Sequence, residues 1–215
     1  MKLIKIFILI LVTMLLFTGC GKDRGTNENP AGGASTNGEK EVKPLISMQD
    51  YFPPDGSKGH FKGEGNELAD FNFEVTQPLE NYFVVHENNK GTILRRIFKI
   101  QTDRIDLLDS KVVDVEKDFP SLEELDAMNP ISVYLQQPFT VGTVFGNWTI
   151  VQTGVEVETP YQVFDNAIVI ESKEKNVVLR KYFVSGFGEV KRESAMETKD
   201  GSILTTSSSL ESLGS

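Results

Sequence analysis

The chain has 215 residues, of which 39% are hydrophobic and 25% charged, proportions that fit a soluble globular body. Its formal net charge is −9. This acidic balance argues against nucleic acid and against adhesion to anionic lipid head groups, because both would be repelled. Cys20 is the only cysteine, which excludes an internal disulfide and a cysteine metal site.

The first twenty residues have the composition of an export signal. Lys2 and Lys5 precede the apolar run Ile6–Phe17, and Cys20 follows shortly after it. A helix of about 12 residues extends roughly 18 Å, too short for a hydrocarbon core of about 30 Å. The pattern therefore predicts a lipoprotein signal peptide over residues 1–19, with Cys20 as the site of diacylglyceryl attachment. An ordinary signal peptide with an incidental cysteine is the alternative.

The segment after the cysteine is polar. Gly21–Lys43 is rich in Gly, Asn, Ser, Thr, Glu and Lys, and it cannot bury enough apolar surface to offset the entropy of ordering it. We expect a lipidated flexible tether over residues 20–44 and a β-rich extracytoplasmic domain over residues 45–215. The protein would then be anchored to the cell membrane and face its extracytoplasmic side. A leader without a spacing role is the alternative for the tether.

Extended segments are predicted through most of this domain. In Phe71–Gln77 apolar and polar residues alternate with a period of two, as in a strand with one buried face. Asn88-Asn89-Lys90-Gly91 has the residues that a tight hairpin needs for positive φ. The predicted strands are 59–64, 71–77, 82–87, 92–101, 104–115, 131–135, 147–152, 155–159, 161–164, 167–171, 177–183, 189–196 and 203–208.

One short helix interrupts these strands. Ser121 at the N-cap and Glu124 three positions later form a capping box, and Asn129-Pro130 ends the helix. A shorter helical turn is expected over 46–52. Short strands with turn signals about every eight to twelve residues indicate a mainly β protein. We expect a single antiparallel, strongly curved sheet or partly open barrel with one short helix.

The sequence contains none of the common catalytic or metal-binding motifs. There is no G-x-S-x-G, no H-E-x-x-H, no phosphate-binding Gly-rich loop and no calcium loop. We therefore predict no enzyme activity and no catalytic, cofactor or metal residues. A zinc site built from His60, His86 and a carboxylate is a minor alternative to surface histidines. A solvated surface is preferred over a calcium site for the acidic group Glu116, Asp118, Glu123, Glu124 and Asp126.

The aromatic residues admit two interpretations. They could form a plain core, or they could line a cavity that holds an apolar ligand, as curved sheets can. Trp148 is expected in the core, on one strand face with Ile150. The residues concerned are Phe71, Phe73, Tyr82, Phe83, Phe98, Tyr134, Phe139, Phe145, Trp148, Tyr161, Phe164, Tyr182, Phe183 and Phe187.

Arg96 is the single charged residue on an otherwise apolar strand face. Its neighbours on that face are Leu94, Phe98 and Ile100, while the opposite face is expected to border solvent. If the first face packs inward, the guanidinium must be paired, because an isolated buried charge is costly. Among Glu64, Glu67 and Glu74, we expect Glu67 to be its partner. Snorkelling to water along the apolar stem is the alternative.

Four motifs occur in an order that resembles a known family. The family usually has glycine after the tyrosine of the third motif, where this chain has Gln162. The motifs are Gly63-Glu64-Gly65-Asn66-Glu67 before a hairpin, Val141-Gly142-Thr143 leading to Trp148, Thr159-Pro160-Tyr161-Gln162-Val163-Phe164, and Tyr182-Phe183 leading to Gly186-Phe187-Gly188-Glu189-Val190-Lys191. Over residues 50–212 the chain thus resembles uncharacterised exported lipoproteins of Gram-positive, often spore-forming, bacteria. The resemblance implies an all-β domain without an assigned activity, and it supplies no catalytic residues.

Two functions follow from these observations. The first is a lipid-anchored, non-enzymatic binding or structural module of the cell envelope. The second is a carrier or sensor that holds a lipid or other apolar ligand in a cavity of the curved sheet. The expected partners are the membrane, through the anchor at Cys20, and an envelope protein or apolar ligand of unknown identity. No cofactor and no nucleic acid are expected.

Overall fold

The computed structural model describes residues 47–114 and 120–214. These residues belong to one compact unit, Pro44–Ser215. The predicted signal peptide and the predicted tether with Cys20 lie outside the described residues. Glu116 and Asp118 also lie outside them. Within the described ranges, no helix is long and apolar enough to cross a membrane.

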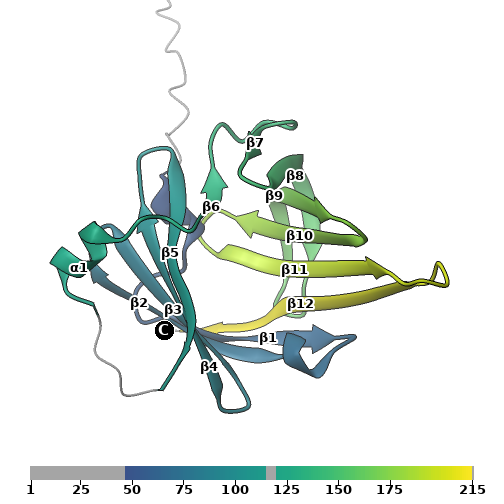
Figure 1. The fold of residues 1–215 in the computed structure, drawn as a ribbon, viewed down its shortest axis with the longest axis horizontal. Coiled ribbons are helices and arrows are strands. Elements are labelled where there is room, and N and C mark those ends of the chain that lie inside the picture. The colour runs from purple at the N-terminus through teal and green to yellow at the C-terminus, as the bar shows by residue number, and fades with distance from the viewer. Residues whose placement is uncertain (1–46, 115–119, 215) are drawn as a thin grey trace, which may run out of the picture. The chain divides into compact units, whose positions relative to one another are not determined.

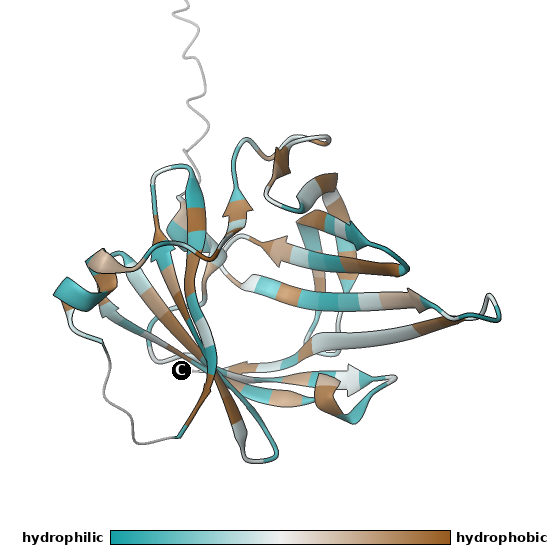
Figure 2. Cartoon of the chain, in the orientation of Figure 1, coloured by the Kyte–Doolittle hydropathy of each residue, from teal (hydrophilic) through white to brown (hydrophobic). Residues whose placement is uncertain are grey.

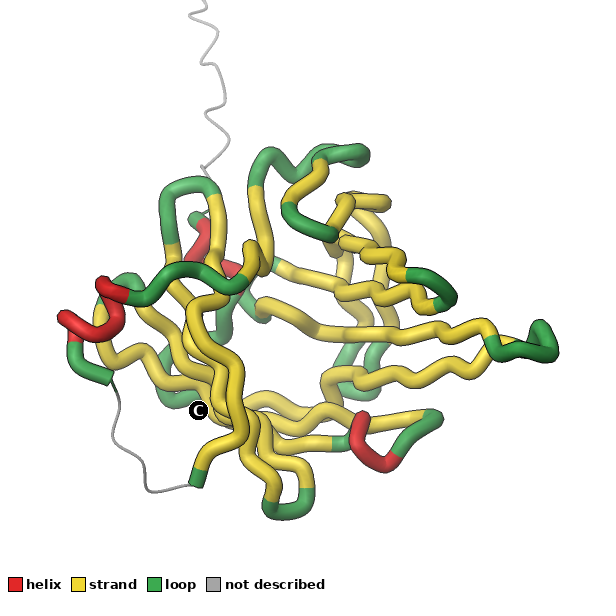
Figure 3. The backbone as a smooth tube through the Cα atoms, viewed as in Figure 1, coloured by secondary structure: helices red, strands yellow, loops and turns green. Residues whose placement is uncertain are grey.

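Strands dominate this unit, and its helices are short (Figures 1 and 3). The elements in chain order are η1 (Met48–Tyr51), β1 (Lys58–Glu64), η2 (Glu67–Ala69), β2 (Phe71–Leu79), β3 (Tyr82–Asn89), β4 (Thr92–Ile100), β5 (Arg104–Val113), α1 (Leu122–Ala127), β6 (Ser132–Gln136), β7 (Val144–Phe145), β8 (Trp148–Glu158), β9 (Val163–Glu174), β10 (Val177–Val184), β11 (Gly188–Glu197) and β12 (Ile203–Gly214).

The strands form one antiparallel sheet that curls into a nearly closed barrel. Its order is β6-β5-β4-β3-β2-β1-β12-β11-β10-β9-β8-β7, so each strand pairs with its neighbours in sequence except where β1 pairs with β12. The edge strands β6 and β7 meet at a seam that no strand pairing closes within the described part of the chain (Figure 1). The predicted fold class, a strongly curved sheet or partly open barrel with one short helix, is confirmed.

Hydrophobic and hydrophilic residues alternate along the strands, which gives the barrel a packed interior (Figure 2). Strand β2 shows the period most clearly: Phe71, Phe73 and Val75 are buried, and Asn72 and Glu74 between them are exposed. This is the alternation that the sequence predicts. The hairpin between β3 and β4 is also as expected, since Lys90 and Gly91 have positive φ angles of 46° and 99°.

Two pairs of predicted strands are single strands in the structure. The segments 147–152 and 155–159 form β8, and Gly154 lies inside it at a register shift, with a φ of 69°. The segments 161–164 and 167–171 likewise join in β9, where Asn166 has a φ of 59°. A positive φ occurs in bulges within a strand as well as in turns between strands, so the predicted breaks between these segments were wrong.

The helix α1 covers part of the outer face of the barrel. Leu125 is fully buried there, in a small cluster with Tyr82, Val84, Ile97 and Leu108. The face of β4 opposite Arg96, which was expected to border solvent, is therefore covered: Ile93, Arg95 and Ile97 on it are buried. The helix begins as predicted, because Ser121 and Glu124 form the capping box.

The short helix η1 packs against the barrel core. Phe52, which follows it, stacks on Phe83 with ring centroids 4.7 Å apart. The turn between β10 and β11 receives this segment: the Gly186 N–H donates to the Asp50 carbonyl at 2.5 Å. A Cβ at Gly188 would lie 2.6 Å from the Tyr51 carbonyl oxygen, so only glycine fits there, in its conformation with φ of 75°. The helical turn expected over 46–52 is confirmed for Met48–Tyr51.

Candidate ligand-binding cavity

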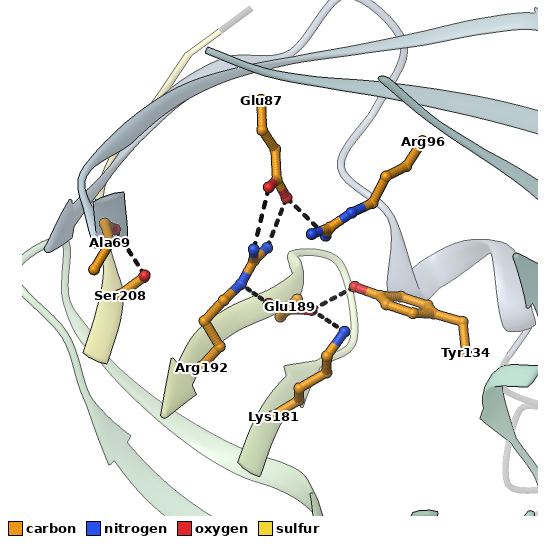
Figure 4. Close-up of polar contacts among 8 residues, drawn as sticks. All are labelled: Ala69, Glu87, Arg96, Tyr134, Lys181, Glu189, Arg192 and Ser208. Atoms are coloured by element: carbon orange, nitrogen blue, oxygen red, sulfur yellow. Dashed lines mark hydrogen bonds and ion pairs between the residues drawn. The ribbon is translucent and has the colours of Figure 1, made fainter. Parts of the chain in front are cut away.

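Charged side chains meet inside the barrel, contributed by strands from opposite walls. We call the set the charged network (Figure 4), and it consists of Glu87 on β3, Arg96 on β4, Tyr134 on β6, Lys181 on β10, and Glu189 and Arg192 on β11. The alternation of these strands directs the six side chains inward, where they replace the hydrophobic residues of an ordinary core.

Arg192 is the centre of the network. Its Nη1 and Nη2 donate to Glu87 Oε2 and Oε1 at 3.2 and 2.8 Å, and its Nε donates to Glu189 Oε1. Arg96 approaches Glu87 from the adjacent strand, with Nη1 2.9 Å from Oε1. This fork-to-carboxylate geometry is the strong, directional form of an ion pair.

Lys181 and Tyr134 complete the network at Glu189. The Tyr134 hydroxyl donates to Glu189 Oε2 at 2.5 Å, and Lys181 Nζ lies 3.2 Å from the same oxygen. The Lys181 ammonium also lies over two aromatic rings, 4.3 Å from the centroid of Tyr134 and 5.5 Å from that of Trp148. A cation over an aromatic face is held by the quadrupole of the ring.

The electrostatic balance keeps both carboxylates ionised. Burial alone would raise the pKa of Glu87, but the charges of Arg192 and Arg96 outweigh it and hold that pKa below its usual value. In the same way, Arg192 and Lys181 overcome burial and hold the pKa of Glu189 far below the ordinary range. Burial lowers the pKa of Lys181 to about 8, with Glu189 opposing the shift. At neutral pH the network thus holds three cations and two anions.

Two cavities border the network on its two sides. The larger has a volume of about 480 Å³ and the smaller, deeper one about 50 Å³. Phe71, Glu87, Arg96 and Arg192 line both, so these side chains separate the two spaces. The larger cavity is lined by Asn66, Leu68, Ala69, Phe71, Glu87, Asn89, Thr92, Leu94, Arg96, Trp148, Leu179, Arg180, Lys181, Arg192, Glu193, Ser194, Thr206 and Ser208.

Arg96 has hydrogen-bonding capacity left over. Its side chain is 19% exposed, and only Nη1 is engaged, by Glu87. Nε and Nη2 of Arg96 make no hydrogen bond within residues 47–114 and 120–214. A guanidinium carries five N–H donors, so this one presents unused donors at the boundary of the two cavities.

The expected partner of Arg96 was wrong. Glu67 lies in η2 with an 81% exposed side chain, and its carboxylate is 3.9 Å from Lys90 Nζ. The true partner, Glu87, could have been found from the hairpin, because Asn89 pairs with Thr92 and Val85 therefore opposes Arg96. Glu87 is two residues from Val85, hence a diagonal neighbour of Arg96 on the same face.

The aromatic residues divide between the two interpretations. Most belong to the packed core, with Phe83, Phe98 and Phe183 almost fully buried. Phe71 and Trp148, however, also line the larger cavity. Trp148 packs against the core, on the strand face that was expected. It is not fully buried, however: Ile150 has no exposed surface, whereas Trp148 is half-buried and borders the larger cavity.

The predicted alternatives for metal binding find no matching geometry. The ring nitrogens of His60 lie 2.8 Å from Glu211 Oε2 and 3.1 Å from Asp70 Oδ1. The described residues contain no group of three or more His, Cys, Asp or Glu side chains placed to hold a metal ion. In the acidic group, Glu124 caps α1, and Asp126 accepts hydrogen bonds from Tyr82 and Lys99.

Fold and site together define a class: a nearly closed antiparallel barrel with a polar network and a cavity inside it. No protein-family model and no curated protein matches the chain. The chain is similar to a "putative exported protein with YmcC-like fold" from Bacteroides fragilis NCTC 9343. The two are 14% identical, with a TM-score of 0.47, over 77% of this chain and 99% of that one. A likeness this distant assigns neither family nor activity. No match supports the resemblance to Gram-positive lipoproteins.

Proposed function

We propose that this protein is a non-enzymatic binding module of the cell envelope whose barrel interior holds a small ligand. The observation that carries the proposal is the cavity of about 480 Å³, with apolar walls and the charged network at its base. Small-molecule sites typically measure about 300–1,000 Å³ and combine hydrophobic walls with a few convergent polar groups. Both features are present.

The cavity walls support a binding role over a purely structural one. Leu68 and Leu179, which line the cavity, remain 68% and 39% exposed, although they are large and apolar. A barrel that needed only rigidity would gain stability by packing such side chains, since each buried methylene contributes about 0.8 kcal/mol. Apolar surface left open inside a concavity is typical of a site that receives a ligand.

The chemistry of the network supports the absence of catalysis. An acid or base catalyst works best with a pKa near the working pH, but the pKa values of Glu87 and Glu189 are shifted downward by their cationic partners. Both carboxylates therefore stay ionised and saturated with hydrogen bonds. Neither carboxylate is thus poised to exchange a proton with a substrate, and Lys181, whose pKa is lowered to about 8, is held in an ion pair with Glu189.

The envelope location rests on the amino-terminal sequence. A positive region, a short apolar run and Cys20 support export, lipidation of Cys20 and attachment to the membrane on its extracytoplasmic side. One diacylglyceryl group carries two acyl chains, which is what stable attachment requires. The motif resemblance to exported lipoproteins of Gram-positive bacteria points the same way.

A structural module is the second candidate. The charged network connects β3 and β4 with β10 and β11 across the barrel, so it acts as an internal strut (Figure 4). The same ion pairs can stabilise the barrel and border a binding site, but a purely stabilising role requires no ligand. The two functions therefore differ in whether the isolated protein carries a bound molecule.

Native mass spectrometry of the full chain, purified from membranes in two detergents of different mass, tests the proposal. We expect an additional bound mass that is the same in both detergents. Leu179→Glu places a charge on the cavity wall and should abolish it, whereas Leu204→Glu, at a 56% exposed position that does not line the cavity, should not. If the wild-type chain carries no such mass and also binds no amphiphile added to it, the structural module is the correct function.

A further inference from the structure

We propose that the ligand is an anionic amphiphile, with a carboxylate or phosphate monoester that binds at Arg96 and Lys181 and an apolar tail that lies along Phe71, Leu94, Trp148 and Leu179. This inference rests on the proposed binding function and names the chemical class of the ligand. It follows from the charge, the free donors and the walls of the larger cavity.

The charge of the network calls for an anion. Arg96, Arg192 and Lys181 face only two carboxylates, those of Glu87 and Glu189, so one positive charge is in excess. All three cations line the larger cavity. A bound anion would balance this charge, and an ionic contact is stronger beside apolar walls than in bulk water.

The free donors of Arg96 supply the geometry of recognition. Glu87 engages one of its nitrogens, and Arg96 Nε and Nη2 make no hydrogen bond in the described ranges. Two guanidinium nitrogens on one edge are the fork that binds a carboxylate or phosphate through paired hydrogen bonds. Arg192, by contrast, already uses all three nitrogens on Glu87 and Glu189.

The walls of the cavity favour a tail rather than a compact ion. Apolar side chains from η2, β2, β4, β8 and β10 line it: Leu68, Phe71, Leu94, Trp148 and Leu179. A free inorganic anion would leave this surface in contact with water, whereas an alkyl chain would cover it. Asn66, Thr92 and Thr206 add polar groups to the lining.

A cationic amphiphile does not fit the same network. Both oxygens of Glu87 and both oxygens of Glu189 already accept hydrogen bonds from Arg96, Arg192, Lys181 or Tyr134. A cationic head group would therefore find no free oxygen on either carboxylate of the network and would meet the excess positive charge. A neutral alcohol would fill the cavity but gain no ionic contact.

The experiment uses the fluorescence of Trp148, the single tryptophan of the chain, which lies on the cavity wall. The full chain carrying Cys20→Ser, which lacks the lipid acceptor, is titrated with dodecanoate, dodecyl phosphate, dodecanol and dodecyltrimethylammonium. We expect the two anions to bind on the order of tenfold or more tightly than dodecanol, as charge-assisted hydrogen bonds would give. Dodecyltrimethylammonium should bind weakest.

Arg96→Met connects the preference to the proposed residue. It should reduce the affinity for dodecanoate to that for dodecanol and leave dodecanol unchanged, and Glu87 keeps Arg192 as its partner in this variant. Lys58→Met removes an exposed cation outside the cavity and should change neither affinity. Thermal melting checks that each variant is folded. If Arg96→Met does not fold, Lys181→Met is used instead. The selectivity of the wild-type chain among the four amphiphiles still tests whether the head group is anionic.

Each outcome separates this inference from the proposed function. If dodecanol binds as tightly as dodecanoate, or if dodecyltrimethylammonium binds tightest, the anionic head group is wrong while the binding function stands. If Arg96→Met retains the preference for anions, the head group binds elsewhere and the assignment to Arg96 is wrong. If none of the four binds and no molecule accompanies the purified chain, the binding function itself fails.

Discussion

The pairing of Arg96 with Glu87 is the interaction on which the site is built, and a double-mutant cycle measures it. The two side chains are 19% and 9% exposed, and their atoms are 2.9 Å apart. We expect Arg96→Met and Glu87→Gln to show a coupling of about 1–3 kcal/mol in urea unfolding, as for contacting groups in one network. Glu87 keeps Arg192, which limits the coupling.

Glu67 provides the control for this cycle. Its side chain is 81% exposed and it contacts Lys90 rather than Arg96. The cycle of Arg96→Met with Glu67→Gln should therefore give a coupling below about 0.5 kcal/mol, as for groups that share no contact. Substantial coupling to Glu67 and none to Glu87 would contradict the structure.

Cys20 is the residue on which the location depends. Cys20→Ser removes the thiol that would accept the diacylglyceryl group, so we expect the variant to be released from the membrane or left unprocessed. Labelling cells with radioactive palmitate and fractionating them measures both effects. The wild-type protein should carry label in the membrane fraction. A variant that still carries label would exclude Cys20 as the attachment site.

At this scale the sequence identifies the unusual residue but not its partner. Arg96 stands out because it interrupts an apolar face, and pattern alone shows that it needs compensation. The sequence does not identify Glu87 as the partner, because this residue ends a predicted strand and is followed by the polar residues of the hairpin turn. Lys181, Glu189 and Arg192 come from the far side of the barrel. No local pattern predicts that Arg192 contacts Glu87, which is about a hundred residues away in the sequence.

The helix α1 contributes to stability through one residue. Leu125 is fully buried against β3, β4 and β5, and Leu122 on the same helix is 51% exposed. Leu125→Ala should lower the free energy of unfolding by about 2–5 kcal/mol, the usual cost of emptying a packed site. Leu122→Ala should change it by no more than about 0.5 kcal/mol. Equal effects of the two substitutions in urea unfolding would show that the helix is not packed on the sheet.

Elements were predictable where a local signal has one meaning, and less so where it has two. The capping box at Ser121 and the hairpin at Lys90-Gly91 each have a single structural solution, and both were placed correctly. Gly154 is ambiguous, because a positive φ occurs in a bulge within a strand as well as in a turn between strands. Which solution is used depends on the neighbouring strand, which lies elsewhere in the sequence.

For the whole molecule, alternation and turn spacing predict a curved antiparallel sheet, because both are repeated along the chain. Closure is different. It depends on the long-range pairing of β1 with β12, at opposite ends of the domain, and no motif specifies that pairing. The cavity is a product of closure, since its lining comes from both halves of the barrel. A sequence can therefore suggest that an interior exists without showing what it contains.

The charged network makes the stability of the barrel depend on pH. The pKa values of Glu87 and Glu189 are lowered in the folded protein from an unfolded value of 4.5. A group with a lowered folded pKa stabilises the fold above its unfolded pKa, and this contribution is lost as the pH falls toward the folded value. We therefore expect the stability that the network contributes to decline as the pH falls below about 4.5.

Glu189→Gln isolates this contribution from that of other acidic residues. The side chain is 6% exposed and pairs with Arg192 and Lys181, so the substitution should cost about 3–5 kcal/mol at pH 7, as when one member of a buried ion pair is removed. The difference in unfolding free energy between variant and wild type should shrink at pH 3. At that pH the Glu189 carboxylate is protonated in the unfolded wild type, so it must lose its proton on folding, which costs free energy. Glu74→Gln, which removes an exposed pair with Lys58, should cost at most about 1 kcal/mol at either pH. Urea unfolding at pH 7, 5 and 3 measures all three proteins, and a Glu189→Gln difference that stays constant over this range would show that Glu189 is not held ionised by its partners.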